Sequence, residues 1–212
     1  MEDKKISKAV IRRLPRYYRY LSTLKEEGIT RISSKELSER MRITASQVRQ
    51  DLNCFGGFGQ QGYGYNVDSL YKEIASILGI DKNYKAIVIG AGNMGKSLAQ
   101  YKNFSKRGFT ITAIFDNNPE LIGTQIANLE VRDVASLETF MQENRVDVAM
   151  LTVPRGVAKE MAERVVALGV RGIWNFSPMG VLVSDENVVV ENVHLSDSLM
   201  VLGYRLSEQG QE

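Results

Sequence analysis

Apolar side chains recur at steps of three and four over residues 7–27, and basic residues fill the opposite side of the pattern. This spacing predicts an amphipathic helix that buries one face. Pro15 interrupts the pattern and predicts the first turn of a fresh helix, because a missing N–H has no cost there. Gly28 is the expected C-terminal cap.

Two short helices are predicted next by their capping signals. Ser33-Ser34-Lys35-Glu36 is a capping box that opens a helix over residues 34–41. Thr44-Ala45-Ser46-Gln47 is a second capping box that opens a helix over residues 45–53. Only Arg42 and Ile43 lie between the first helix and the second capping box, so the segment predicts a helix-turn-helix unit. Its outward side carries Ser46, Gln47, Arg49, Gln50 and Asn53, because Val48 and Leu52 face the core.

A glycine-rich segment follows and predicts a β-hairpin. Gln60-Gln61-Gly62 forms the expected turn, with Phe58 on one strand and Tyr63 or Tyr65 on the other. A hairpin directly after a helix-turn-helix is typical of the wing of a winged-helix domain. Asp68 then predicts the cap of a helix over residues 69–78, which Gly79 closes.

The remaining chain alternates apolar strand segments with helical ones. Strands are expected at 85–90, 109–116, 146–153, 172–176 and 188–191, and helices at 93–103, 136–144, 156–168 and 195–207. Continuous apolar strands separated by helices indicate a parallel sheet covered on both faces. We therefore expect an α/β protein with a winged-helix domain over 1–80, a linker over 81–84, a doubly wound Rossmann-type sheet over 84–192, and a terminal helical segment over 193–212.

Composition excludes several classes of protein. The single cysteine, Cys54, excludes a disulfide framework, and with the single histidine, His194, it excludes a Cys/His zinc site, so we expect no metal. No segment is long enough to span a membrane, and the charged first residues do not predict a secretory signal. A cytoplasmic protein is expected. Cys54 is expected to be a small packed residue, and a redox role is the alternative.

The net charge of +2 is unevenly distributed. Residues 1–65 hold 13 Lys and Arg against 7 Asp and Glu, a net of +6, whereas residues 66–212 hold 14 against 18. A basic first third favours a module that faces nucleic acid. The alternative is an uneven scatter of surface charge.

The segment Gly90-Ala91-Gly92-Asn93-Met94-Gly95 follows one predicted strand and opens a helix. In this context the glycines allow a tight turn, a close approach to a pyrophosphate, and close packing of helix on strand. Asp116 ends the second strand 21 residues later, where a carboxylate accepts a hydrogen bond from an unmodified ribose and repels a 2′-phosphate. The pattern predicts NAD(H) binding, and a glycine turn that binds coenzyme A is the alternative.

The predicted winged helix carries groups suited to DNA. Amides, hydroxyls and the Arg49 guanidinium on its second helix fit base edges and phosphates in a major groove. Arg12, Arg13 and Arg16 are expected to contact phosphates, and the wing is expected to lie along the backbone of the DNA with Gln60, Gln61 and Tyr63. A winged helix that binds another protein is the alternative.

These segments together resemble the Rex family of redox-sensing transcriptional repressors over about residues 7–206. The resemblance rests on Arg13-Leu14-Pro15-Arg16-Tyr17-Tyr18-Arg19, Ser33-Ser34, Val48-Arg49-Gln50-Asp51-Leu52, Phe55-Gly56, Gly62-Tyr63-Gly64-Tyr65-Asn66-Val67, the glycine segment, Leu151-Thr152-Val153-Pro154 and Asn175-Phe176-Ser177-Pro178. It implies a cytoplasmic homodimer that binds a palindromic operator and reads the NADH/NAD⁺ ratio. NADH would close the dimer and release DNA, and the terminal helix would be exchanged between subunits.

The resemblance also implies switch residues. Tyr101 and Arg19 match positions that are tied to the exchanged helix in the family. His194 stands where the family often has Asp, and Leu195 stands where some members have an aromatic residue. Since histidine titrates near neutrality, this departure predicts a pH-sensitive response. An identical pH dependence of NADH-driven operator release in His194→Asn would refute that prediction.

Discrimination between the two nucleotides must come from the nicotinamide, whose ring is charged only in NAD⁺. An apolar pocket penalises that charge, and its expected walls are Thr152, Val153, Pro154, Tyr101 and Leu195. No tyrosine has a lysine four residues later, and no proton donor is evident, so we expect a regulator without catalytic residues. The alternatives are an NAD-dependent oxidoreductase fused to a DNA-binding domain, and a constitutive DNA-binding protein with a structural nucleotide.

Overall fold

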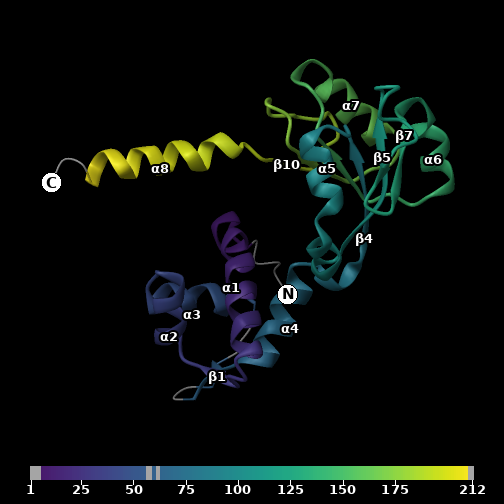
Figure 1. The fold of residues 1–212 in the computed structure, drawn as a ribbon. Helices are drawn as coiled ribbons and strands as arrows, with labels where there is room; N and C mark the ends of the chain where they lie inside the picture. The colour runs from purple at the N-terminus through teal and green to yellow at the C-terminus, as the bar shows by residue number, and fades with distance from the viewer. Residues whose placement is uncertain (1–5, 56–58, 61–62, 210–212) are drawn as a thin grey trace. The chain divides into compact units, whose positions relative to one another are not determined.

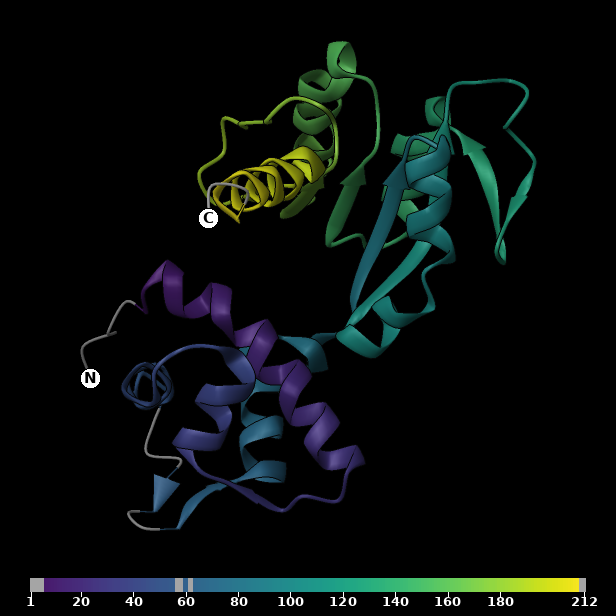
Figure 2. The same cartoon turned by 60° about the vertical axis from the view of Figure 1, so that its left-hand side comes forward.

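The computed structural model describes residues 6–55, 59–60 and 63–209. The backbone separates into two compact units, Met1–Asp81 and Lys82–Glu212. Figure 1 and Figure 2 show each unit from two directions.

The first unit begins with α1 (Lys8–Glu26), which is one continuous helix with Pro15 inside it. The prediction that Pro15 opens a fresh helix was therefore wrong. Pro15 is exposed, while Leu14, Tyr17 and Leu21 on the other face are almost fully buried. Burial of this continuous apolar stripe outweighs the backbone hydrogen bond that proline cannot donate.

The helix-turn-helix is confirmed as α2 (Ser34–Met41) and α3 (Ala45–Asn53). Ser33 and Glu36 form the complete reciprocal capping box. At the second helix only half of the predicted box forms. Thr44 accepts from the backbone of Gln47, but the Gln47 side chain bonds to Asp51 instead of turning back.

The predicted hairpin is present within a three-stranded antiparallel sheet of order β1-β3-β2, formed by β1 (Arg31–Ile32), β2 (Gly59–Gln60) and β3 (Gly64–Asn66). Gly64 has a φ of +70°, and a Cβ there would lie 2.6 Å from the Ile32 carbonyl oxygen. The predicted turn residues Gln61 and Gly62, and the strand residue Phe58, lie outside the described residues.

Helix α4 (Val67–Ile77) closes the first unit, and it begins earlier than predicted. Asn66, not Asp68, is its N-cap and accepts from the backbone N–H of Ser69. Asp68 lies in the first turn and pairs with Lys25 and Lys72, because a carboxylate is stabilised by cations as well as by the helix dipole. Helix α4 packs on α1, where the rings of Tyr18 and Tyr71 stack.

Cys54 was predicted to be a packed residue, and that prediction was wrong. It is exposed at the C-cap of α3, where its thiol donates to the carbonyl oxygen of Gln50. The buried positions of α3 are Val48, Asp51 and Leu52, so Cys54 lies past the last apolar turn.

The second unit is built on a seven-stranded sheet of order β10-β9-β8-β4-β5-β7-β6, in which only β6 runs antiparallel to its neighbour. The strands are β4 (Tyr84–Ile89), β5 (Phe109–Asp116), β6 (Gln125–Ile126), β7 (Leu129–Asp133), β8 (Val148–Leu151), β9 (Gly172–Asn175) and β10 (Val189–Asn192). The helices are α5 (Asn93–Gln100), η2 (Lys102–Arg107), η3 (Val134–Ser136), α6 (Leu137–Glu143) and α7 (Arg155–Ala167), and the short η1 (Ile80–Lys82) spans the boundary between the two units. The expected doubly wound parallel sheet is confirmed.

Two apolar cores cover the sheet, one on each face. One contains Ile87 and Phe115 with side chains of α6 and α7, and the other contains Val88 and Met150 with side chains of α5 and η2. Strands β6 and β7 were not predicted, since each buries a single residue at the sheet edge and so leaves no apolar run. The predicted linker is replaced by η1 and the start of β4.

Helix α8 (Leu195–Gln209) ends the described chain, and none of its residues is buried. Its exposed apolar side chains are Leu195, Leu199, Met200, Val201, Leu202, Tyr204 and Leu206. No described helix combines the length and apolar character that a membrane span requires.

Candidate functional site

The glycine turn joins β4 to α5 in the expected geometry. Gly90 has a φ of +101°, and a Cβ there would lie 2.6 Å from the Thr152 carbonyl oxygen. A Cβ on Gly95 would lie 1.9 Å from the Gly90 carbonyl oxygen. These two glycines are therefore required by packing of the protein itself. A Cβ on Gly92 would meet nothing within 4 Å, so this position is open for a ligand.

The N-terminus of α5 also lacks a side-chain cap. Gly92 is its N-cap residue, and no side chain accepts a hydrogen bond there. The first turn of a helix carries unpaired backbone N–H groups and partial positive charge. This end of α5 is consequently suited to phosphate oxygens.

Asp116 lies beside the glycine turn at the end of β5. One carboxylate oxygen accepts a hydrogen bond from the backbone N–H of Ala91, and the other accepts from Asn118 at 2.8 Å. The carboxylate thus holds the glycine turn against the loop after β5. That placement brings it to the position from which a ribose hydroxyl would be recognised.

A cavity of about 460 Å³ joins these features at the carboxyl ends of the parallel strands. Gly90, Gly92, Asp116 and the segment Thr152–Pro154 all line it, as predicted. The sequence reasoning missed further lining residues, which are Ile89, Asn117, Asn118, Leu121, Val134, Val157 and Met161. Asn117 and Asn118 directly follow Asp116, and this adjacency is the signal that would have found them.

Several predicted nucleotide-site residues lie outside this cavity's lining. Ala91 is buried under the turn, and Met94 packs into the core beneath α5. Tyr101 is 47% exposed at the C-cap of α5, with its ring edge-on to Phe104, and Leu195 is exposed at the start of α8. The structure therefore does not bring Tyr101 and Leu195 to the cavity within one chain.

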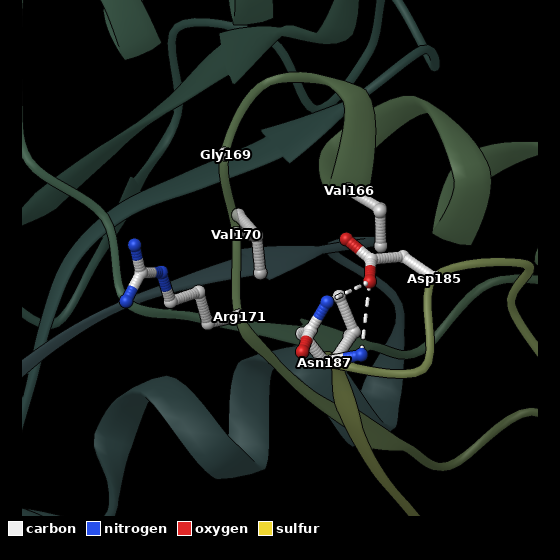
Figure 3. Close-up of a pocket in the computed structure, with 7 residues that line it drawn as sticks. Val166, Gly169, Val170, Arg171, Asp185 and Asn187 are labelled. Atoms are coloured by element: carbon white, nitrogen blue, oxygen red, sulfur yellow. Dashed lines mark hydrogen bonds between the residues drawn. The ribbon is translucent and has the colours of Figure 1, made fainter.

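A second cavity of about 430 Å³ lies near the amino ends of β9 and β10 and contains none of the predicted residues (Figure 3). It is lined by Val166, Gly169, Val170, Arg171, Asp185, Asn187 and Val188. Asp185 accepts from both the backbone and the side-chain nitrogen of Asn187, at 2.9 Å each. Its carboxylate stabilises its own loop and forms no cluster with the predicted site.

The outward face of α3 is as predicted at four positions. Ser46, Arg49, Gln50 and Asn53 are exposed. Arg49 donates to the Ser34 hydroxyl at 3.2 Å, which links α3 to the start of α2. On α1 the side chains of Arg12 and Arg19 are exposed as well.

Arg13 and Arg16, which were predicted to contact phosphates, both form hydrogen bonds within the protein. The Arg13 guanidinium makes a two-pronged salt bridge to Asp51, with both N–O distances at 2.7 Å. Arg16 donates to the carbonyl oxygen of Met41, at the end of α2. Both cations satisfy buried or half-buried acceptors of the protein, because such acceptors are costly to leave unpaired.

Gln47 also points away from the exposed face. It is half-buried, and its amide nitrogen donates to Asp51 at 2.8 Å. The Tyr17 hydroxyl donates to the same carboxylate at 3.0 Å. Burial alone would raise the pKa of Asp51, but the hydrogen bonds from Arg13, Gln47 and Tyr17 outweigh it and hold that pKa below its ordinary value.

The wing contributes a cation that sequence reasoning missed. Arg31 of β1 donates to the Tyr63 carbonyl oxygen at 3.3 Å, and its guanidinium lies 5.8 Å from the Tyr63 ring centroid. Tyr63 is 70% exposed, as expected of a residue that faces a partner. The pairing of β1 with β3 brings the two together, and β1 is too short to leave a periodic signal.

Family models match both units. The model described as "Putative DNA-binding protein N-terminus" matches residues 5–53, and "CoA binding domain" matches residues 81–179. The chain is 54% identical to the redox-sensing transcriptional repressor Rex of Thermoanaerobacter pseudethanolicus, over 97% of this chain and 91% of the relative. It is also 54% identical to the repressor of the same name from Clostridium botulinum, over 98% and 99%. The chain belongs to the Rex family.

Solved structures agree with this membership. The crystal structure of RSP, a Rex-family repressor, has a TM-score of 0.90 at 50% identity and covers 97% of this chain and 96% of that one. RSP in complex with β-NAD⁺ and operator DNA has a TM-score of 0.91 at 53% identity, over 97% and 94%. RSP with β-NADH has a TM-score of 0.90 at 50% identity, over 98% and 97%. These relatives are named as transcriptional repressors and not as oxidoreductases.

Proposed function

We propose that this Rex-family chain represses transcription as a homodimer on a palindromic operator, and that NADH releases it from DNA. The observation that carries the proposal is the open cavity at the glycine turn, within a chain that is half identical to a repressor solved with NADH and with NAD⁺ and operator DNA. NAD(H), rather than coenzyme A, fits the carboxylate of Asp116, which disfavours a phosphorylated ribose.

The nucleotide would lie across the carboxyl ends of β4, β5 and β8. Backbone N–H groups at the start of α5 suit the pyrophosphate, and Gly92 leaves room for it. Asn93 is exposed beside that turn. The apolar walls at Val153, Pro154 and Val157 support a nicotinamide subsite that tolerates the neutral ring of NADH better than the charged ring of NAD⁺.

The DNA would be bound by the first unit, with α3 in the major groove. Exposed polar groups on α3 suit base edges, and Arg12, Arg31 and the wing residue Tyr63 suit the phosphate backbone. Gln60 and Gln61 are proposed as further DNA contacts from this segment. A repressor works where the chromosome is, so we place the protein in the cytoplasm.

The terminal helix supports the proposed dimer. Seven apolar side chains of α8 are more than half exposed, which is a large unpartnered apolar surface for one helix. We assign residues 193–212 to subunit exchange, residues 1–80 to DNA and residues 84–192 to the nucleotide. In an exchanged arrangement Leu195, His194, Tyr101 and Arg19 are the proposed switch residues between the two functions.

The test is a titration of a fluorescent palindromic duplex with the protein at fixed salt, followed by addition of NADH or NAD⁺. Salt must be fixed, because phosphate contacts make affinity steeply salt-dependent. We expect release by NADH and much weaker release by NAD⁺. Tight binding that ignores both nucleotides would overturn the sensor mechanism, and the absence of duplex binding would overturn the repressor function.

A further inference from the structure

The recognition helix α3 carries a carboxylate that is completely buried. Asp51 has an exposed fraction of 0%, yet it lies on the same short helix as the exposed Arg49, Gln50 and Asn53. A buried charge is strongly unfavourable unless it is paired and hydrogen-bonded. The reason for its presence must lie in the groups that surround it.

Four hydrogen bonds converge on the Asp51 carboxylate from two helices. Arg13 of α1 donates twice, from Nε and from a terminal nitrogen, at 2.7 Å each. Tyr17, one turn later on α1, donates at 3.0 Å. Gln47, one turn earlier on α3, donates at 2.8 Å. Among the described residues, no buried side-chain nitrogen or oxygen lacks a partner, so this network is fully satisfied.

This network fixes the orientation of α3 against α1, which the apolar packing around it does not. Leu14 of α1 and Val48 and Leu52 of α3 belong to one apolar core, which favours association of the two helices, but the hydrophobic effect has little directionality. A planar guanidinium that forms two parallel bonds to a carboxylate fixes both distance and orientation. The two-pronged salt bridge between Arg13 and Asp51, called the fork below, therefore resists rotation and sliding of α3 against α1.

We propose that Arg13 and Asp51 are positioning residues for operator recognition, which set the orientation of α3 and make no contact with phosphate themselves. The inference rests on the proposed DNA-binding function and refines it. Base contacts depend on the placement of α3, whereas phosphate contacts tolerate small displacements because they are largely electrostatic. Loss of the fork should consequently weaken operator binding more than non-specific binding.

The network also sets the conformation of Gln47. Because Asp51 accepts from its amide nitrogen, the amide oxygen of Gln47 points away from the carboxylate. Gln47 is half-buried at the start of α3. The orientation imposed by Asp51 therefore reaches a side chain that the sequence placed among the base-contacting groups.

The decisive variant is Arg13→Lys, which keeps the positive charge but cannot form the fork. Affinities for the palindromic operator and for a scrambled duplex of the same length are measured at one fixed salt concentration. We expect the ratio of operator affinity to scrambled affinity to fall about tenfold, with scrambled affinity nearly unchanged. Thermal unfolding of each variant shows that the protein is folded at the assay temperature.

The control is Arg164→Lys, which breaks a fork of the same geometry in the nucleotide-binding unit. Arg164 of α7 bonds both oxygens of Glu138 of α6 at 2.7 Å, and both helices belong to the second unit. This variant should leave the affinity ratio unchanged. Should Arg13→Lys fail to fold, Tyr17→Phe removes one bond to Asp51 at almost constant volume and should lower the ratio by a smaller factor in the same direction.

Three outcomes are decisive. An unchanged ratio in Arg13→Lys would overturn the inference, since a phosphate-binding lysine replaces a phosphate-binding arginine with little loss. An equal fall in both affinities would also overturn it, because that result indicates only a smaller folded fraction. A wild-type protein with no preference for the operator would instead refute the proposed function.

Discussion

At the residue scale, the Asp51 network predicts a pH dependence of stability. The pKa of Asp51 is held below the ordinary value of 3.8, so the charged form is stabilised in the folded protein. The contribution of ionised Asp51 to the free energy of unfolding is fully present above the unfolded-state pKa and is lost as pH falls through the lower folded-state pKa. We expect the difference in Tm between wild type and Asp51→Asn to shrink below about pH 4. A constant difference down to pH 2.5 would contradict this.

Alanine substitutions at Gly92 and Gly95 of the glycine turn are predicted to have different effects, one on NADH binding and the other on stability. Gly95→Ala places a methyl group 1.9 Å from a carbonyl oxygen, so it should lower the free energy of unfolding by about 2 kcal/mol or more. Gly92→Ala meets no atom within 4 Å at an ordinary φ of −69°, so Tm should be unchanged. Its methyl group would instead obstruct the nucleotide, and calorimetry should show at least tenfold weaker NADH binding. Equal NADH affinity in Gly92→Ala and wild type would show that the nucleotide lies elsewhere.

The sequence predicted well those residues whose role is local. The glycine turn, Asp116 and the Ser33 capping box depend on backbone geometry within a few positions, and each is where it was expected. The sequence analysis placed Arg13, Arg16 and Gln47 on the outward faces of their helices. Helical periodicity predicts the side of a helix on which a residue lies, but it does not predict the hydrogen-bond partner of the side chain. Asp51 is 38 positions from Arg13, and no local pattern reports such a pairing.

At the element scale, prediction succeeded where a cap or an apolar run marks the boundary. Helices α2 and α3 and strand β5 have the predicted bounds, since Ser33, Thr44 and a continuous apolar run define them. Strands β1 and β6 are two-residue edge strands and β7 lies next to the edge, and their pairing is decided by the sheet rather than by their own residues. The continuous α1 shows the same principle, because packing outweighed the local signal of Pro15.

Helix α8 carries the element-scale prediction. Leu199 and Leu202 are 67% and 51% exposed and lie on adjacent turns, so burial in a partner subunit would remove both from water. A Leu199→Glu, Leu202→Glu double variant should shift a dimer toward monomer by at least tenfold in dissociation constant, as measured by analytical ultracentrifugation. Ser207→Glu, whose neighbours one turn earlier are Gly203 and Tyr204 rather than leucines, is the matched control. A dimer unaffected by the double variant would place the subunit interface away from α8.

At the scale of the whole molecule, the proposed nucleotide and DNA sites are on separate units of one chain. Binding at one site can affect binding at the other only through a coupling free energy. Gly92 and Asp116 belong to the second unit, whereas Arg49 and Asn53 belong to the first. A ligand shifts such an equilibrium only by binding two conformations with different affinity. We propose that the exposed terminal helix reports nucleotide binding to a second subunit.

This coupling must be reciprocal, which allows the mechanism to be tested from the nucleotide side. If NADH weakens operator binding by some factor, saturating operator must weaken NADH binding by the same factor, expected between about 5 and 150. NADH affinity is measured by fluorescence with and without operator, at the salt concentration of the DNA titration. A chain truncated before α8 should still bind NADH measurably. In that variant the effect of NADH on operator affinity and the effect of operator on NADH affinity should both fall toward a factor of one. Unequal factors in the wild type would show that NADH displaces DNA by a route other than a shared conformational equilibrium.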